Sequence, residues 1–233
     1  MTPLKIEIEL ATPFVKSGFP LHLDSLVAYA YQRHYLGDEA LPDEQALMAI
    51  VDDLPIEKHV QEGDWVYKAS ALVPEGTLLH GSRFLTRRYS DEDTAIAAAH
   101  GKIKYGKYKP GTPQKRHAQK IDTQRGPQKN ILAYYPTTEC QRMVAYCIGD
   151  KPLLEEALCE WGYISHVGAQ RRMGHGLVKA ISLTEDDTAL NAWQIRTMPW
   201  AINSDMMPLT CTTRNPYFYK RNMKPAYCHV AAL

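Results

Sequence analysis

The sequence predicts an α+β fold in which strands and helices alternate around one sheet. Three observations predict it: an alternating polar and apolar segment at the start, helical spacing directly after it, and the same strand-to-helix order near residue 150. The segment from Lys5 to Leu10 alternates polar and apolar side chains, which is typical of a half-buried strand. After it, Asp24 is the expected helix N-cap, and apolar residues recur at helical spacing through about Tyr35.

The middle of the sequence predicts one more helix and two strands. The helix is expected from about Asp43 to Val51, with Pro42 just before its start. Trp65–Val73 is an apolar segment bounded by glycine and proline, and we expect it to form a single strand. A further strand is expected from Leu78 to Tyr89.

The strand-to-helix order repeats in the second half. Gln141–Ile148 predicts a strand. Pro152 lies near the first position of a helix whose apolar stripe extends to Trp161, and Gly162 is expected to end it. A strand over Leu177–Leu183 follows after a loop.

Strand, helix and strand, repeated in an otherwise antiparallel pattern, predict a ferredoxin-like (RRM-like) βαββαβ core. We expect a single domain over residues 1–233. A basic insertion at about residues 101–130 would separate the two halves of the core, and residues 190–233 would form an irregular C-terminal extension with short strands.

The net charge of +1 hides a strong separation of charge. Residues 102–129 contain nine basic residues and one acid, whereas the rest of the chain contains 18 basic and 25 acidic residues. This separation favours a polyanion bound locally by an otherwise acidic body. Glycine and proline in the basic segment indicate an extended or mobile loop, and a hairpin near Pro110-Gly111 is compatible with them.

Cysteine usage and hydropathy exclude several classes of protein. The five cysteines contain no C-x-x-C pair, so we expect reduced thiols rather than a zinc site, and we expect no cofactor. No segment approaches the roughly 18 consecutive apolar residues of a membrane helix. The first residues have no basic region leading into an apolar stretch, so we expect a cytoplasmic protein without a secretory signal or a membrane partner.

The strongest functional signal lies in the loop between residues 164 and 178. It contains three glycines and two adjacent arginines: Gly168, Gly174, Gly176, Arg171 and Arg172. Glycine permits tight turns and close approach of a ligand backbone, and guanidinium groups match phosphate. Because the loop follows a helix and precedes a strand, it has the reverse order of a dinucleotide-binding turn, which excludes that reading. The alternative is a connector whose arginines are only solvated.

The motif in its context resembles a known RNA-binding family. From Ile164 to Val178 the pattern is Ile-x-x-x-Gly-x-x-Arg-Arg-x-Gly-x-Gly-x-Val, between a helix and a strand. This resembles the glycine-rich loop of the RAMP superfamily, the ferredoxin-fold RNA-binding subunits of CRISPR–Cas complexes. The lead-in at residues 144–153 and the N-terminal strand and helix also resemble that family. The resemblance covers residues 4–33 and 143–183.

Within the superfamily, the size and these blocks most resemble the small subunit of type IV effector complexes. The resemblance implies a non-catalytic subunit that caps the 5′ handle of the guide RNA (crRNA), at one end of a filament of backbone RAMP subunits and beside a large subunit. It also implies a contribution to contacts with the DNA duplex that flanks the target. The residues expected to contact RNA in the loop are Gly168, Gln170, Arg171, Arg172, Gly174, His175 and Gly176.

Basic residues outside the loop are further candidates for RNA contact. In the basic segment they interleave with Tyr105 and Tyr108, which offer faces for base stacking. They are Lys102, Lys104, Lys107, Lys109, Lys115, Arg116 and Lys120. The alternative is a solvated loop. Arg83, Arg87 and Arg88 either line the same surface or pair with surface acids, and only the first two would share a strand face.

An endoribonuclease that processes guide RNA is the alternative from another class. Metal-independent cleavage of RNA needs one group to activate the 2′-hydroxyl and another to protonate the leaving oxygen. The histidine candidates by residue type are His22, His80, His100, His117, His166 and His175. We expect no catalytic residue and no metal site. A protein-interaction module with an unused glycine loop is a third possibility.

Overall fold

The computed structural model describes residues 1–37, 43–88, 90, 92–93, 96, 99–100, 129–217 and 219–233. The chain divides into two compact units. The first comprises residues 1–81 and 137–233, and the second comprises residues 82–136. The expectation of a fold that mixes helices with sheets is confirmed.

The first unit is built on a four-stranded sheet with the order β4-β7-β1-β8. Its strands are β1 (Thr2–Leu10), β4 (Val73–Glu75), β7 (Arg142–Gly149) and β8 (Val178–Glu185). All neighbouring strands are antiparallel, and Ile6 of β1 lies opposite both Ala145 and Leu183. The first strand of the chain is therefore one of the two inner strands of the sheet.

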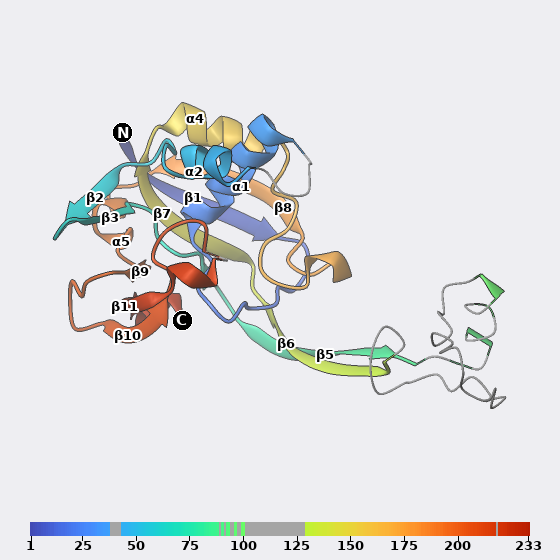
Figure 1. Ribbon diagram of the computed structural model, residues 1–233. Helices are drawn as coiled ribbons and strands as arrows, with labels where there is room; N and C mark the ends of the chain where they lie inside the picture. The colour runs from blue at the N-terminus through green and yellow to red at the C-terminus, as the bar shows by residue number, and fades with distance from the viewer. Residues whose placement is uncertain are drawn as a thin grey trace, which may run out of the picture. The chain divides into compact units, whose positions relative to one another are not determined.

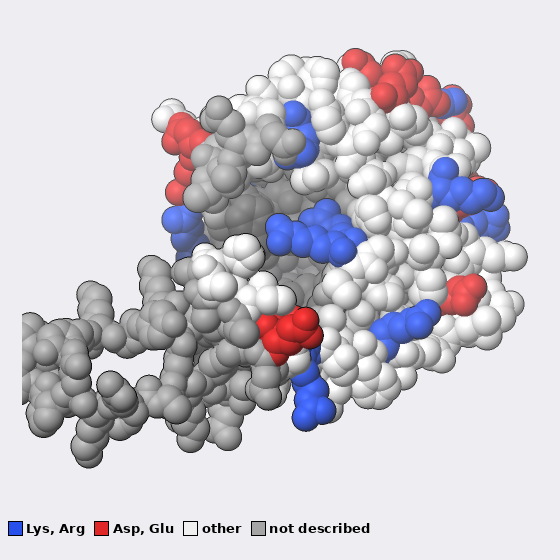
Figure 2. Space-filling view, turned by 90° about the vertical axis from the view of Figure 1, so that its right-hand side faces the viewer, with Lys and Arg blue, Asp and Glu red and all other residues white. Residues whose placement is uncertain are grey.

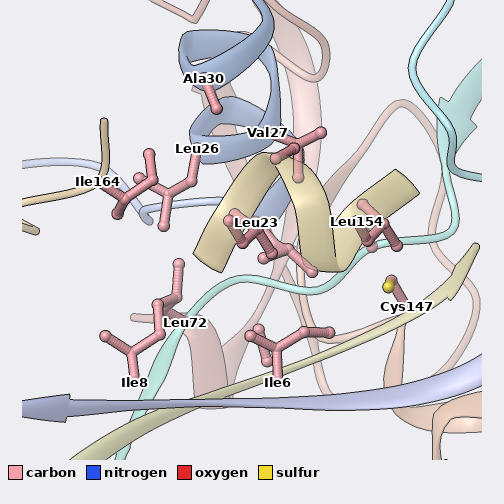
Figure 3. Packing of buried hydrophobic residues seen from close by; sticks show 14 of the residues in the cluster. Ile6, Ile8, Leu23, Leu26, Val27, Ala30, Leu72, Cys147, Leu154 and Ile164 are labelled. Carbon is pink, nitrogen blue, oxygen red and sulfur yellow. The ribbon is translucent and has the colours of Figure 1, made fainter. Parts of the chain in front are cut away.

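Three helices cover one face of this sheet: α1 (Leu23–Leu36), α2 (Glu44–Val51) and α4 (Lys151–Glu155) (Figure 1). The alternation in β1 sends Leu4, Ile6 and Ile8 to this face, where their side chains are fully buried. Figure 3 shows Ile6 and Ile8 packed among helical and loop side chains that include Leu23 and Leu154. Each such side chain contributes about 1.5–3 kcal/mol through burial.

The C-terminal part of the chain packs partly against the other face of β7. It contains α5 (Ala189–Ala192), β9 (Thr197–Met198), β10 (Met206–Cys211) and β11 (Lys224–His229). The three strands form an antiparallel sheet in the order β10-β11-β9. Ile148 of β7 joins Trp193, Met198 and Trp200 in a second apolar cluster.

A buried arginine connects the C-terminal part to the helical layer. Arg196 is fully buried, and its guanidinium donates to the carbonyl oxygens of Tyr67 and Ala69 and, at 2.7 Å, to the hydroxyl oxygen of Tyr217. The same group lies 3.5 Å from the carboxylate of Asp24, which also accepts a hydrogen bond from the Tyr217 hydroxyl. The charge of Arg196 is thus compensated inside the protein.

This pairing makes the expected N-cap of the first helix wrong. The N-cap position is His22, whose side chain makes no capping bond, and Asp24 lies in the first turn, fully buried. The carboxylate of Asp24 faces Arg196 and Tyr217. Burial raises the pKa of Asp24, while Arg196 and the Tyr217 hydroxyl act in the opposite direction.

The expected single strand over residues 65–73 is also wrong. The chain forms β3 (Asp64–Tyr67), which pairs with β2 (Lys58–Gln61), and then makes isolated bridges, Ala69 with Cys147 and Ala71 with His22, until β4 begins at Val73. The interruption coincides with the carbonyl groups of Tyr67 and Ala69, which accept from Arg196. The expected strand from Leu78 is β5 (Leu79–Arg87), and its partner β6 (Ile131–Glu139) has no counterpart among the predicted elements.

The helix after β7 begins and ends where the sequence predicts, but its second half has a different geometry. After α4 the chain continues as η1 (Glu156–Glu160), a π-helical turn in which the Trp161 amide donates to the Glu156 carbonyl at 3.0 Å. Gly162 follows with a φ of +69°. Of the predicted apolar stripe, Leu154 and Leu158 are buried, whereas Leu153 is 45% exposed.

Candidate nucleic-acid interface

The glycine-rich loop between η1 and β8 is fastened to the segment that follows β1. The hydrogen bonds that join them include Ala169 N–H to Val15 O (2.9 Å), Gly176 N–H to Pro13 O (3.0 Å) and Thr12 Oγ1–H to Gly174 O (2.8 Å). The loop also closes on itself, because the Val167 amide donates to the Gly176 carbonyl at 2.8 Å. Its conformation is therefore set by the protein's own backbone.

Two of the three glycines are required by this close packing. A Cβ added at Gly176 would lie 1.9 Å from the carbonyl oxygen of Val167, and one added at Gly168 would lie 2.7 Å from that of Val15. Both residues also have positive φ angles. Gly174 has a φ of +81° as well, but an added Cβ there would meet nothing within 4 Å. Gly168 and Gly176 therefore fix the loop, while Gly174 only shapes its outer turn.

The two arginines lie on that outer turn. Arg171 and Arg172 form part of η2 (Arg171–Met173), a short 3-10 helix between Gln170, which has a left-handed backbone, and Gly174. Both arginines and Gln170 are exposed. The guanidinium carbon of Arg171 lies 5.8 Å from the ring centroid of Tyr29 on α1. Figure 2 shows the side of the molecule on which this turn lies in Figure 1, with Lys and Arg side chains at several separate places.

A groove of about 300 Å³ lies beside Arg171 and Gly168. Its floor is largely apolar, and polar side chains line it from three parts of the chain: Ser25, Tyr29 and Gln32 of α1, His166 and Arg171 of the loop region, and Asn215. An aromatic ring, an amide, an imidazole and a guanidinium around an apolar floor are groups that proteins use to hold an unstacked base. One signal for this groove is present in the sequence, because the spacing of residues 25, 29 and 32 places them on one face of a helix.

His175 takes a different place from the arginines. Its Nδ1 lies 3.3 Å from the carbonyl oxygen of Pro13, and the residue is half-buried. The loop thus brings Gln170, Arg171 and Arg172 together at the surface, while His175 contacts the segment that anchors the loop.

The second unit presents a two-stranded ribbon made of β5 and β6. Phe84 and Tyr134 lie on one face with their ring centroids 5.4 Å apart, and both are more than half exposed. Arg83 and Arg87 have the opposite parity along β5, and Arg88 follows the end of the strand. The Arg87 guanidinium donates to the Lys129 carbonyl at 3.2 Å. The ribbon therefore carries Phe84 and Tyr134 on one face and Arg83 and Arg87 on the other, and these two rings were not among the predicted site residues.

Comparison with protein families identifies the group to which the chain belongs. The family model described as "CRISPR type IV associated protein Csf3" matches residues 2–229. The chain belongs to the Csf3 family. The match confirms the resemblance carried by the glycine-rich loop, at the level of a type IV CRISPR-associated family.

Two further comparisons with known proteins were made for this Csf3-family chain. None of the curated proteins compared with it matches. Among solved structures, a chain of the "Cryo-EM structure of the Type III-B Cmr-beta bound to cognate target RNA" matches with 13% sequence identity and a TM-score of 0.40. The alignment covers 79% of the present chain, which spans 61% of the length of the other chain.

Several predicted features of the Csf3-family chain fall outside the described residues. They are the possible hairpin near Pro110-Gly111, His117, and the candidate RNA contacts Lys102, Lys104, Lys107, Lys109, Lys115, Arg116 and Lys120. The RNA contacts proposed for these residues and for the loop stay predictions. None of the described helices combines the length and apolar character that crossing a membrane requires.

The histidine candidates occupy dissimilar environments. His22 is buried, its ring stacks on Tyr217 with centroids 4.4 Å apart, and burial lowers its pKa well below the usual 6.5. His80 lies 3.4 Å from the hydroxyl of Thr138. His166 lines the groove, and its Nδ1 is 3.1 Å from the hydroxyl oxygen of Ser165. Of these three, His166 alone lies beside the arginines of the loop.

Proposed function

We propose that this chain is a non-catalytic subunit of a type IV CRISPR–Cas ribonucleoprotein effector complex and binds the 5′ handle of the guide RNA. Membership of the Csf3 family supports its place in a type IV complex. The observation that carries RNA binding is the loop itself, whose glycine frame holds Arg171 and Arg172 at the surface, with Arg171 beside a groove of about 300 Å³. Guanidinium groups bind phosphate, and Tyr29 offers a ring for a base.

The strand order supports a ferredoxin-like core for the same protein. The strands β1, β4, β7 and β8 follow one another with α1 after the first and α4 before the last, and their spatial order is β4-β7-β1-β8. This is the arrangement of a split βαβ unit doubled in one antiparallel sheet. We propose that the sheet is the RAMP core and that the complex is cytoplasmic.

The β5–β6 ribbon supports a second nucleic-acid contact within its own unit. Residues 82–136 contain twelve basic and four acidic residues, and the exposed rings of Phe84 and Tyr134 add stacking faces to the arginines. Proteins that bind single strands combine cations with aromatic platforms in this way. We propose that this unit binds guide RNA or the DNA that flanks the target. We also propose that backbone RAMP subunits and a large subunit are the protein partners of the chain.

A binding measurement tests the function assigned to the loop. Fluorescence anisotropy with a labelled guide-RNA handle would compare the wild-type chain with the Arg171→Ala/Arg172→Ala variant. We expect a loss of affinity of roughly ten-fold or more, about 1.4 kcal/mol, because two charge-assisted contacts are removed. The matched control is Lys5→Ala/Lys151→Ala, which removes two cations that lie in surface ion pairs with Glu7 and Glu185. Equal affinity of the two double variants would contradict the proposal.

An RNA cleavage assay distinguishes the non-catalytic function from the alternative, an endoribonuclease that processes guide RNA. The place of His166 beside Arg171 in the groove is the observation that keeps this alternative testable. Incubation of the purified chain with repeat RNA in the absence of metal should leave the RNA intact. A single defined cut that disappears in the His166→Ala variant would overturn the non-catalytic assignment.

A further inference from the structure

An aromatic cluster lies where the end of α1 meets the end of η1. It consists of five rings: Tyr31, His34 and Tyr35 on α1, and Trp161 and Tyr163 after η1. His34 stacks on Trp161 with centroids 4.0 Å apart and planes 12° from parallel. Tyr31 meets the same indole edge-on at 5.0 Å. Trp161 is therefore the centre of the cluster.

A π-helical backbone conformation just before Trp161 helps to hold its indole at the centre of the cluster. The π-helical turn ends with the Trp161 amide bonded to the Glu156 carbonyl, and the indole N–H donates to the Glu156 carboxylate at 3.1 Å. Gly162 then turns the chain with a φ of +69°. Single π-helical turns are rare and occur often at functional sites. The indole is thus held from both its backbone and its ring nitrogen.

The outer rings of the cluster remain exposed. Tyr35 is 64% exposed, and His34 is also exposed, although both pack against other rings. Preassembled aromatic rings at a surface lose little conformational freedom on binding and are enriched among the residues that dominate protein–protein interfaces. The geometry of the cluster therefore fits a surface that receives a partner.

The charges beside the cluster are negative. Glu155, Glu156 and Glu160 lie on the adjoining α4–η1 helix, and the pKa of Tyr31 is raised to about 12, first by burial and then by Tyr35, Glu156, Asp150 and Asp53. In Figure 2 the largest group of Asp and Glu side chains lies near the top of the view, at the height at which Figure 1 places α4. These carboxylates repel phosphate, so a nucleic acid is the wrong occupant.

The cluster also lies on a different side of α1 from the groove near Arg171. Successive helical residues are about 100° apart, so residues 31, 34 and 35 lie roughly 120° around the helix from residues 25, 29 and 32. One helix thus separates an acidic aromatic surface from the groove that we assign to RNA.

We propose that the aromatic cluster of Tyr31, His34, Tyr35, Trp161 and Tyr163 is the docking surface for an arginine-rich surface of another protein subunit of the complex. Guanidinium groups stack on aromatic rings and pair with carboxylates in one arrangement, which lysine does less well. The exposed rings and the carboxylates of Glu156 and Glu160 offer both interactions side by side. The proposal rests on the membership of the chain in a multi-subunit complex and does not depend on RNA binding by the loop.

The test is co-expression of the full-length chain, carrying an affinity tag, with the other subunits of its type IV complex and the guide RNA. The variant is Tyr35→Ala/Glu160→Arg, which removes an exposed ring and reverses one charge. We expect the amount of other subunits recovered per tagged chain to fall roughly ten-fold or more, as for truncation of an interface hot spot. Two controls, Asp187→Arg at another exposed acid and Tyr35→Phe, should recover the complex as wild type does.

Binding of the guide RNA by the isolated variants separates the possible outcomes. We expect Tyr35→Ala/Glu160→Arg to bind the RNA as tightly as the wild-type chain and to melt at a similar temperature. Normal recovery of the complex by this variant would overturn the proposal. A loss of RNA affinity as large as that of Arg171→Ala/Arg172→Ala would also overturn it, because RNA would then be the occupant. If the wild-type chain binds no guide RNA but its recovery still depends on Tyr35, the function proposed for the loop fails and the docking surface stands.

Discussion

At Gly176 the loop leaves no room for a side chain. A Cβ there would lie 1.9 Å from the carbonyl oxygen of Val167, and the φ of +67° disfavours any L-residue. We expect Gly176→Ala to lower the free energy of unfolding well beyond the roughly 1–2 kcal/mol that a left-handed backbone costs by itself. Gly174→Ala, where φ is +81° and the space is open, should cost only that amount. Denaturant unfolding of both variants measures the difference, and equal losses would contradict the close packing described here.

The buried arginine makes a second prediction at the level of single residues. Arg196→Met removes the cation that faces Asp24 and the guanidinium donor to the carbonyl groups of Tyr67 and Ala69. Breaking a buried ion pair from one side typically costs 3–5 kcal/mol, and we expect a loss of about that size in the free energy of unfolding. The control is Arg214→Met, which breaks a partly exposed pair with Asp64 and should cost about 1 kcal/mol or less. If both variants lost a similar free energy of unfolding, burial of the Arg196–Asp24 pair would not account for the loss.

His22 links stability to pH. Burial, followed by the charge of Arg196, lowers the pKa of His22 well below 6.5, so the folded protein holds this ring neutral. Below pH 6.5 the unfolded chain binds a proton at this position that the folded chain does not, so stability is complete above that pH and decreases as the pH falls. We expect the free energy of unfolding to fall by up to about 1.4 kcal/mol per pH unit from this group. The His22→Gln variant should lose that part of the slope, and an unchanged slope between pH 6.5 and 5 would refute the assignment.

At the scale of elements, local sequence determines some helices and strands, whereas others depend on residues far away in the chain. The period-two pattern of β1 and the helical spacing of α1 depend on neighbouring residues and were predicted correctly. The irregular stretch between β3 and β4 was not, and it contains carbonyl groups that accept from Arg196, about 130 residues further along the chain. The π-helical turn was not predicted either, and the residue that ends it, Trp161, stacks on His34 of another helix.

The candidate site divides in the same way. Gly168, Arg171 and Arg172 were found because a glycine-arginine motif is contiguous in sequence. Tyr29 and Gln32 were missed as site residues because the groove brings them together with the loop and with Asn215 only in the folded chain. In the sequence alone, Tyr29 and Gln32 look like ordinary positions of an amphipathic helix.

The β5–β6 ribbon is expected to be the least protected strand pair of the described chain. Most of its residues are exposed on both faces, and an isolated two-stranded ribbon has marginal stability in water. Hydrogen exchange measured by mass spectrometry should show amides of residues 82–87 and 131–136 exchanging orders of magnitude faster than those of β1, whose protection approaches the global free energy of unfolding. Protection of the ribbon should increase when guide RNA or the complete complex is added. Equal protection of the ribbon and β1 in the free chain would contradict this expectation.

At the scale of the whole molecule, charge is divided between the two units. Residues 82–136 carry twelve basic and four acidic residues, and the remainder carries 15 basic and 22 acidic residues. Binding of a polyanion by the basic residues releases counterions, so the affinity for guide RNA should decrease as salt increases. In a plot of log K against log salt concentration we expect the Arg171→Ala/Arg172→Ala variant to have a slope shallower by about 1.4 than wild type, roughly 0.7 for each lost contact. A slope near zero for the wild-type chain would exclude phosphate contacts.

The inner position of the first strand, between β7 and β8, has a consequence for biosynthesis. Leu10 at the end of β1 pairs with Val178, so 168 residues separate two neighbours in the sheet. At a synthesis rate of about 5–20 residues per second, β1 waits roughly 8–34 s on the ribosome before its second neighbour emerges. During that time Leu4, Ile6 and Ile8 have no completed core to enter, and the nascent chain presents the apolar face of β1 to chaperones and to other chains. The yield of folded subunit should therefore respond to translation speed and chaperone supply.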